Sequence, residues 1–415
     1  TKAAQPTKAK PTPAPKKAQE IHFLCRADIK PAYAAKEAVD DWNATHDSKV
    51  VLDEPAEGSP VDVKVKAAQA AGDLVWDGFA VVEAPGTLVK WQMAGIVQPL
   101  DDYIAASTVP KADQVVPNII PSIKESASIE GKVYGIPGNV GSVALAWFWE
   151  PLKAIGLEDQ PETWDELYEA AKKIKEAKPD LVPFGSALGP LCDLYAILWS
   201  SRDDPFDENE LVDIRSEEAI WALKWMRKMI EEGLMYDTPN TGLSQWLKGG
   251  WAMISSYDVA GTMAQQTFGM DAAATGINCR RFKGEIKAGT PFWINVCVVF
   301  DKCKNPQGMT DFYLWWFGPD NKKTGEQITK VAAKPCYKYT YDEFVKGHPE
   351  FEWEQKGIDL VAKSAWFRKV PTWGIQRDIT RQYLDKVYDL SLKFEPQAWM
   401  DQAYKDIQAE IAKMK

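Results

Sequence analysis

The sequence lacks the short motifs that mark most catalytic and nucleotide-binding proteins. Its 415 residues contain no GxxxxGK[ST] phosphate loop, no GxGxxG fingerprint, no GxSxG nucleophile elbow and no HExxH zinc motif. Only three histidines occur, His22, His46 and His348, and no two are close enough to form a local zinc pair. We therefore expect a protein that is not an enzyme. A glycoside hydrolase or lyase stays open, because 59 acidic residues can always supply a carboxylate pair.

Cysteine is thinly spread, and long apolar runs are missing. No CxxC pair occurs, so we expect no zinc site and no cofactor, while disulfides and free buried thiols both stay open. The acidic run at 203–210 has oxygen ligands for calcium but lacks the glycine and spacing of an EF-hand, so a solvated loop is the alternative. No apolar stretch reaches the roughly 18 residues that a membrane-spanning helix needs.

Basic residues are outnumbered and unevenly distributed. The chain has 49 Lys and Arg against 59 Asp and Glu, a net charge of −10, which argues against a nucleic-acid binder. Residues 1–19 hold five lysines, four prolines and no acid, so 44 basic residues face 59 acidic ones in the rest, a charge of −15. A segment this polar cannot bury apolar area, so we expect 1–19 to be a disordered linker. It suits an exported protein held away from a surface; a cytosolic tail is the alternative.

Tryptophan is the residue type in excess, with 18 copies. A sugar ring has an apolar C–H face and a rim of hydroxyls. Indole rings supply a flat apolar surface, and Asp, Glu, Asn and Arg supply hydrogen-bonding groups. A Trp-rich acidic sequence without catalytic motifs therefore indicates a carbohydrate binder. Several tryptophans fall on predicted helix faces, where packing in a core is the simpler role.

Hydrophobic periodicity predicts a mixture of strands and helices. Strand, helix and strand follow one another after the linker, which favours a parallel sheet with crossover helices. The pair Thr163 and Glu166 predicts a capping box, and Ser216 predicts the start of another helix. The expected strands are 21–25, 50–52, 79–82, 252–254 and 292–300, and the expected helices are 31–45, 163–178, 216–232, 375–390 and 396–414.

Several segments, taken in order, resemble the extracellular solute-binding proteins of ABC transporters, in the group that includes maltose-binding protein. The resemblance spans about residues 20–415. The chain departs from the family pattern at Phe148–Glu150 and at Ser391–Pro396. The similar segments are 91–103 (WQMAGIVQPLDDY), 131–137 (GKVYGIP), 147–157, 161–174 (PETWDELYEAAKKI), 246–257, 309–318 and 370–390.

The resemblance implies an α/β, two-lobed periplasmic-binding-protein-like fold of type II, with a hinge of crossing strands and a ligand cleft at the hinge. It places the N-terminal lobe at 20–139 plus 283–322 and the C-terminal lobe at 140–282 plus 323–415. The crossings are expected near 138–142, 275–282 and 318–327. The run Gly135–Gly141 fits a hinge by itself, because glycine absorbs backbone rotation without strain; a tight turn is the alternative.

By position in the family pattern, ten residues are expected to line the cleft. Trp293 and Trp373 would be stacking platforms for a sugar ring, and Glu83 is among the residues that would hold hydroxyls. The expected set is Arg26, Asp28, Glu83, Asn139, Ser142, Tyr257, Asp258, Trp293, Asn295 and Trp373, with Trp76, Trp147 and Asp193 as a second group.

The resemblance implies the substrate-binding subunit of an ABC importer, located outside the cytoplasm in the periplasm or tethered to the cell surface. It would capture a mono- or oligosaccharide and deliver it to a membrane permease, as a monomer without a nucleic-acid partner. A lipid anchor upstream of residue 1 is open. The alternatives are the same fold with a polyol, sugar phosphate, peptide or polyamine as ligand, or a carbohydrate-binding adhesin.

Overall fold

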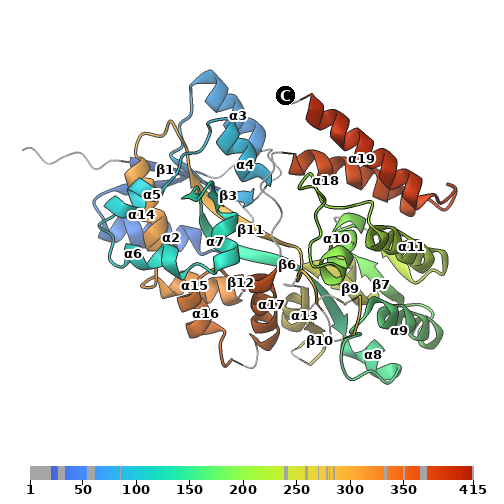
Figure 1. The fold of residues 1–415 in the computed structure, drawn as a ribbon. Coiled ribbons are helices and arrows are strands. Elements are labelled where there is room, and N and C mark those ends of the chain that lie inside the picture. The colour runs from blue at the N-terminus through green and yellow to red at the C-terminus, as the bar shows by residue number, and fades with distance from the viewer. Residues whose placement is uncertain are drawn as a thin grey trace, which may run out of the picture.

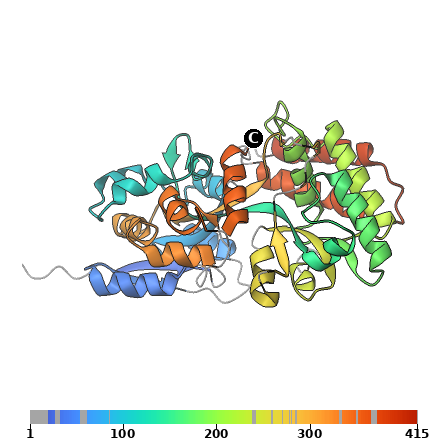
Figure 2. The ribbon, with the colours of Figure 1, turned by 90° about the horizontal axis from the view of Figure 1, so that it is seen from below.

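Two α/β units lie side by side and share their central strands (Figures 1 and 2). The computed structural model describes residues 20–26, 33–53, 61–84, 86–237, 242–257, 260–269, 271–276, 279, 281–283, 286–330, 334–348, 351–364 and 372–413. The expected linker at 1–19 lies outside these residues. Within them, no helix has both the length and the apolar character to cross a membrane.

The strands form one large mixed sheet. Its members are β1 (Glu20–Cys25), β2 (Lys49–Asp53), β3 (Gly78–Ala84), β6 (Ile136–Phe148), β7 (Val182–Ser186), β8 (Met235–Asp237), β9 (Trp251–Tyr257), β10 (Ala273–Thr275), β11 (Phe292–Val299) and β12 (Lys334–Pro335). They run in the order β2-β1-β3-β11-β6-β9-β7-β8, and β10 and β12 also pair with β6. A separate hairpin is formed by β4 (Ser128–Ile129) and β5 (Lys132–Val133). The expected strands are all confirmed, as is the parallel pairing of β1 with β2 and β3.

Helices cover both units. Around the first are α2 (Ala35–Thr45), α3 (Val61–Ala71), α4 (Gly86–Met93), α5 (Asp101–Ala106), α6 (Ala112–Val115), η1 (Val116–Asn118), α7 (Pro121–Ser126), α14 (Pro306–Trp316), α15 (Lys322–Lys330), α16 (Lys338–Phe344) and α17 (Glu352–Lys363). Around the second are α8 (Trp149–Ala154), α9 (Trp164–Ala177), α10 (Pro190–Ser201), α11 (Glu217–Glu231), α12 (Gly242–Trp246), α13 (Ala260–Phe268), α18 (Trp373–Leu384), η3 (Asp385–Val387) and α19 (Pro396–Ala412).

The predicted helix caps are confirmed. The Thr163 hydroxyl accepts a hydrogen bond from the Glu166 backbone N–H at 3.1 Å, and the Glu166 carboxylate accepts one from the Thr163 N–H at 3.3 Å. The Ser216 hydroxyl accepts from the N–H of Ala219 at 3.2 Å. These bonds satisfy backbone donors that have no partner inside the helix, so α9 and α11 begin where local sequence predicts.

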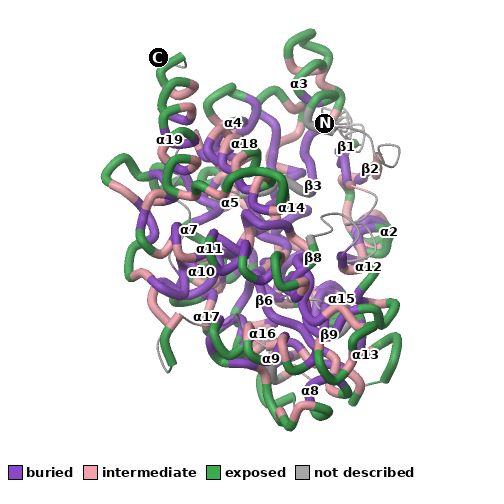
Figure 3. Tube along the Cα trace, turned by 90° about the vertical axis from the view of Figure 1, so that its right-hand side faces the viewer, coloured by how far each residue is buried: buried purple, intermediate pink, exposed green. Residues whose placement is uncertain are grey.

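Two separate hydrophobic cores underlie the two units. The first surrounds β1, β11 and α14, where the Phe23 ring meets Phe312 and Trp316 edge-on. The second surrounds α9, α10 and α11, where Trp164 and Trp225 meet edge-on at 5.2 Å. A third, smaller cluster lies beneath α13. Burial is concentrated along the central strands and inner helices (Figure 3). Tryptophans on helix faces therefore fill cores, as the sequence suggests. Within the part of the chain that the structure describes, the cysteines are thiols rather than disulfides.

β6 carries the chain from one core to the other. Val140 belongs to the first core and Val143 to the second, and the strand is continuous between them. Three chain segments are joined at this point. The Val143 N–H donates to the Pro291 carbonyl at 3.2 Å, and the Thr290 hydroxyl donates to the Val143 carbonyl at 3.0 Å. The Thr290 N–H donates to the Ser364 hydroxyl at 2.9 Å, so the crossing segments brace one another.

The other two crossings differ from the expectation. The chain returns to the first core between Ala288 and Phe292, rather than at 275–282. It leaves again between Val361 and Trp373, rather than at 318–327.

The segment after residue 322 is also placed differently from the expectation, which assigned 323–415 to the second unit. Ile328, Tyr337 and Val361 lie in the first core. The physical reason is the pairing of β12 with β6, Lys334 opposite Val140, which holds this segment beside the first core.

Candidate ligand-binding face at the strand junction

Predicted site residues meet on one face of the sheet, where the two cores join. Asn295 of β11 pairs with Glu83 of β3 on one side and with Asn139 of β6 on the other. Residues directly opposite each other on paired strands share a face of the sheet. These three positions therefore form a row across three strands. The placement of Glu83 follows from backbone register, since its side chain lies outside the described residues.

The row continues along the strands with aromatic residues. Trp293, two residues before Asn295, pairs with Gly141, and Tyr257 at the end of β9 pairs with Val143. The rings of Tyr257 and Trp293 meet edge-on, 6.1 Å apart between centroids and at an interplanar angle of 86°. Among the described residues, a Cβ on Gly141 would have one neighbour within 4 Å, the Tyr257 ring at an ordinary contact distance of 3.6 Å.

This face is open, while the opposite one is packed. Side chains alternate along a strand, so neighbours in sequence point to opposite faces. Phe292 and Ile294 have no exposed surface and Val140 has 1%. Asn139, Trp293 and Asn295 are instead half-buried, and Tyr257 is 43% exposed. We call the open surface formed by Asn139, Gly141, Tyr257, Trp293 and Asn295 the junction face.

A buried tyrosine supports the junction face from below. The Tyr33 hydroxyl donates to Asn139 Oδ1, and Asn295 Nδ2 donates to the same oxygen at 2.9 Å. Burial raises the pKa of Tyr33 well above its usual 10.0, so the hydroxyl keeps its proton. The Tyr33 ring fills the space beside Gly138, where a Cβ would come within 2.6 Å of the ring. The β6–β11 register shifts next to this glycine, a bulge that bends the strand at the site.

The structure turns Ser142 away from the junction face. It is 3% exposed, pairs with Phe292 on the packed side, and accepts a hydrogen bond from the Lys334 ammonium at 3.2 Å. The reason is strand parity, because residues 139 and 142 are three apart and cannot share a face. That Ser142 lines a ligand site stays a prediction.

Trp373 is buried rather than exposed to a ligand. It begins α18 and is 3% exposed. Its ring centroid lies 5.6 Å from that of Tyr195 in the second core, and its Cδ1 would lie 2.8 Å from a Cβ on Gly86 of α4. A stacking role for Trp373 stays a prediction. Arg26 is half-buried at the end of β1, and Asp28 and Asp258 lie outside the described residues.

Of the second group, Asp193 has the most perturbed environment. It lies in the first turn of α10 and is 1% exposed. Burial raises the pKa of its carboxyl to about 6, and the nearby hydroxyls of Ser186 and Ser255 partly offset the rise. Neither carboxyl oxygen has a hydrogen bond of good geometry within the described residues. Trp147 is also buried, and Trp76 packs at the edge of the first core.

Sequence reasoning missed Tyr33 and Gly141. Tyr33 lies 106 positions from Asn139 in the sequence, and no local sequence pattern predicts a contact over that separation. Gly141 lies in the run expected to act as a hinge, and it also leaves room for the Tyr257 ring, whose nearest atom would lie 3.6 Å from an added Cβ. The family pattern points to side chains that could contact a ligand. It gives no signal for a glycine such as Gly141, which contributes by having no side chain.

Comparison with known proteins identifies the family. The profile of the bacterial extracellular solute-binding proteins matches residues 27–323, more than half of the chain. This chain belongs to that family.

The solute-binding protein has curated relatives and structural neighbours. A putative binding protein of Brucella abortus (strain 2308) is 25% identical over 150 residues, 35% of each chain, so the match spans about a third of that relative. The GacH receptor of Streptomyces glaucescens is 16% identical, with a TM-score of 0.75 over 94% of this chain and 99% of that one. The sugar-binding protein MalE of Xanthomonas citri is 16% identical, with a TM-score of 0.77 over 95% and 98%. At these identities the likeness shows the fold, which confirms the two-lobed α/β expectation.

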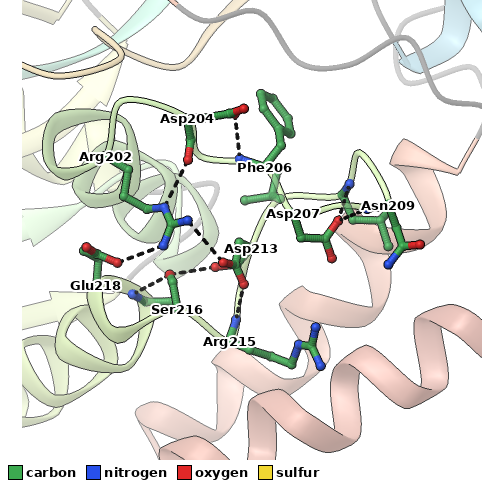
Figure 4. A network of polar contacts seen from close by, with 12 residues as sticks. Arg202, Asp204, Phe206, Asp207, Asn209, Asp213, Arg215, Ser216 and Glu218 are labelled. Carbon is green, nitrogen blue, oxygen red and sulfur yellow. Dashed lines mark hydrogen bonds and ion pairs between the residues drawn. The ribbon is translucent and has the colours of Figure 1, made fainter.

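The acidic run of this solute-binding protein is occupied by its own hydrogen bonds (Figure 4). Asp207 Oδ1 accepts from two backbone N–H groups, those of Asn209 and Leu211, and its Oδ2 accepts from the Tyr404 hydroxyl at 2.7 Å. Arg202 pairs with nearby carboxylates and with the Asp204 carbonyl. Among the described residues, no group of three acidic, histidine or cysteine side chains could hold a metal ion. The calcium alternative gains no support.

Proposed function

We propose that this chain is the substrate-binding subunit of an ABC importer, which captures a carbohydrate on the junction face and delivers it to a membrane permease. The observation that carries the proposal is the junction face itself, an aromatic pair beside an amide pair on an open sheet surface between two cores. Structural neighbours support the ligand class, since they include a receptor solved with acarbose and a protein solved with bound D-mannitol.

The chemistry of the face suits a sugar. The apolar face of a sugar ring can pack on the indole of Trp293, whose flat surface is matched to it. The amides of Asn139 and Asn295 offer both donors and acceptors for hydroxyls. The face spans the transition between the cores, with Asn139 on the first side and Tyr257 on the second. A ligand held by both sides favours the closed arrangement through its additional contacts there.

The lobes and location also belong to this proposal. We place the first lobe at 20–140 plus 292–364 and the second at 143–290 plus 372–413, following core membership. Arg26, Asp28, Glu83, Asp258 and Trp373 remain proposed ligand contacts. Membership of an extracellular family supports an extracytoplasmic location and a permease as partner.

A sugar panel tests the function. D-Glucose, D-galactose, D-mannose, maltose, maltotetraose and D-mannitol are titrated by calorimetry and by the shift in melting temperature. We expect at least one to bind and to raise the melting temperature. Replacing Trp293→Ala should weaken that binding roughly tenfold or more, through lost stacking area. Trp149→Ala, a half-buried tryptophan on α8 away from the junction face, is the matched control and should bind normally. Absence of binding by every sugar would overturn the proposal.

The same samples separate a binder from a hydrolase. Stoichiometric protein is incubated with maltotetraose, and the sugar is examined by mass spectrometry. The proposal requires recovery of the intact tetrasaccharide. Shortened products would favour the glycoside-active alternative.

A further inference from the structure

Tyr33, Asn139 and Asn295 form a network that fixes the orientation of both amides. The Tyr33 hydroxyl is fully buried and protonated, and the acceptor for its proton is Asn139 Oδ1. Asn295 Nδ2 donates to the same oxygen, and Asn295 also partly offsets the raised pKa of Tyr33, as an N–H turned toward the phenol oxygen does. Were the Asn139 amide reversed, the Tyr33 proton and the Asn295 N–H would both lose their acceptor.

This orientation leaves one donor group and one acceptor directed away from the network. Asn139 Nδ2 and Asn295 Oδ1 take part in no hydrogen bond within the described part of the chain. Asn139 and Asn295 are half-buried, so their side chains keep part of their surface in contact with solvent. An amide NH₂ beside an amide oxygen, with no net charge, complements two neighbouring hydroxyls, because each hydroxyl can donate and accept.

We propose that Asn139 and Asn295 determine specificity by holding two adjacent hydroxyls of an uncharged ligand, Asn139 donating to one and Asn295 accepting from the other. Tyr33 is the positioning residue, since it fixes the amide of Asn139 without reaching the open face. The inference rests on the proposed function, and it specifies which ligand groups the junction face binds: two adjacent hydroxyls. An ammonium group in place of the first hydroxyl would meet the Asn139 NH₂, and a carboxylate in place of the second would meet the Asn295 oxygen, so both are disfavoured.

Deoxy analogues test the paired contact. The tightest binder among D-glucose, D-galactose, D-mannose, maltose and D-mannitol is compared with its monodeoxy analogues. We expect two adjacent positions at which loss of the hydroxyl weakens binding roughly ten- to a hundredfold, because the protein amide is then left unpaired. A uniform small effect at all positions would overturn the inference.

Three variants assign the contact to residues. Asn139→Asp keeps the inward acceptor for Tyr33 but replaces the outward donor by an acceptor. A sugar hydroxyl can donate to the new carboxylate, so the deoxy penalty should remain at both positions, and the decisive readout of this variant is its preference for an amino group. The variant should improve the affinity for the corresponding amino sugar relative to the parent sugar. Asn295→Asp keeps the outward acceptor but loses the N–H that bonds Asn139 Oδ1, so it should weaken binding and give no gain for the amino sugar at the Asn139 position. Tyr33→Phe should weaken binding a few-fold and blur the deoxy pattern, because the Asn139 amide is no longer oriented.

The control and the outcomes separate this inference from the function on which it rests. Asn118→Asp introduces the same change of charge in the first lobe, where the Asn118 side chain donates to the Gln114 carbonyl at 2.8 Å, and should leave the deoxy pattern intact. A sugar that binds normally to all three variants overturns the inference and leaves the function standing. Failure of every sugar to bind the unmodified protein overturns both. A gain for the amino sugar in Asn139→Asp cannot arise from a general loss of structure.

Discussion

Asp193 contributes a buried carboxyl whose ionisation opposes folding. Its pKa is raised from 3.8 to about 6 by burial, with Ser186 and Ser255 lowering it in part. Since the folded-state pKa exceeds the unfolded one, the folded protein binds the proton more tightly. The stabilisation is present in full below about pH 4 and is lost as the pH rises through 6. The rise of the pKa from 3.8 to about 6 corresponds to a difference of about 3 kcal/mol in the free energy of unfolding.

Asp193→Asn should remove this pH dependence. Above pH 6 the variant is expected to be more stable than the parent by up to about 3 kcal/mol, and the advantage should vanish near pH 4. Urea unfolding at pH 4.5 and pH 7.5 measures the difference. Asp180→Asn, a change at an exposed position, should show no such divergence. If the free energy of unfolding depends on pH in the same way in the parent and in Asp193→Asn, the raised pKa of Asp193 is contradicted.

Single residues of the junction face could be predicted only in part. The family pattern nominated Asn139, Trp293 and Asn295, and strand alternation places the last two on one face. It nominated Ser142 as well, but parity turns that side chain toward Lys334. Parity is visible in the sequence once a strand is known to be continuous. The Gly-rich run at 135–141 predicts a hinge from its sequence, whereas its continuity through β6 depends on pairing with β11, far away in the chain.

At the scale of elements, β6 combines a tightly packed glycine with an open one. A Cβ on Gly138 would lie 2.6 and 2.8 Å from ring atoms of the buried Tyr33 and 2.9 Å from its hydroxyl oxygen, whereas on Gly141 the nearest described atom is 3.6 Å away. Gly138→Ala should therefore destabilise the protein by about 1–3 kcal/mol through overpacking. Gly141→Ala should change stability by less than roughly 0.5 kcal/mol.

Thermal unfolding followed by circular dichroism compares the two alanine variants. Sugar titration adds a second readout, because the methyl of Gly141→Ala projects onto the open face beside Trp293 and should weaken binding without loss of stability. Equal melting temperatures for both variants would show that the Tyr33 ring can move to make room for the methyl of Gly138→Ala. That result would contradict tight packing at Gly138.

Elements differ in how far local sequence determines them. The starts of α9 and α11 follow from caps within three residues, so the sequence predicts them well. The two-residue strand β12 has no such signal. It exists because Lys334 and Pro335 pair with Val140 and Asn139, and that pairing decides which core the following helices cover. The misplaced third crossing has this origin, since helix periodicity shows that a face is buried but not against which partner.

At the scale of the whole molecule, the two lobes touch away from the crossing strands. The N-terminal end of α18 packs along α4 (Figure 1). Trp373 lies against Gly86 in the first turn of α4, and Gly374 lies against the side chain of Lys90 in its last turn. Trp373 belongs to the second core, while Gly86 opens a helix of the first lobe. Because Gly86 has no side chain, it leaves the space that the Trp373 indole occupies, and we call this space the socket. The contact therefore favours the arrangement in which the lobes approach each other.

Gly86→Ala should shift the lobes apart without disturbing either core. A Cβ at this position would lie 2.8 Å from Trp373 Cδ1. Relief of that overlap by separation is expected to disfavour the touching arrangement by about 1–3 kcal/mol, a factor of roughly 5 to 150 in its population. Small-angle scattering without sugar should show a larger radius of gyration, and apparent sugar affinity should fall in proportion to the lost population.

Trp373→Phe in the Gly86→Ala background supplies the decisive comparison. The smaller ring makes room for the added methyl, so the double variant should recover the compact radius of gyration that Gly86→Ala loses. Such recovery measures coupling between residues of different lobes, which independent local damage would not produce. If Gly86→Ala lowers the melting temperature but leaves the radius unchanged, the overlap is absorbed within α4, and the socket does not set the position of the lobes. Because the scattering is measured without sugar, the outcome bears on lobe closure separately from the identity of the sugar.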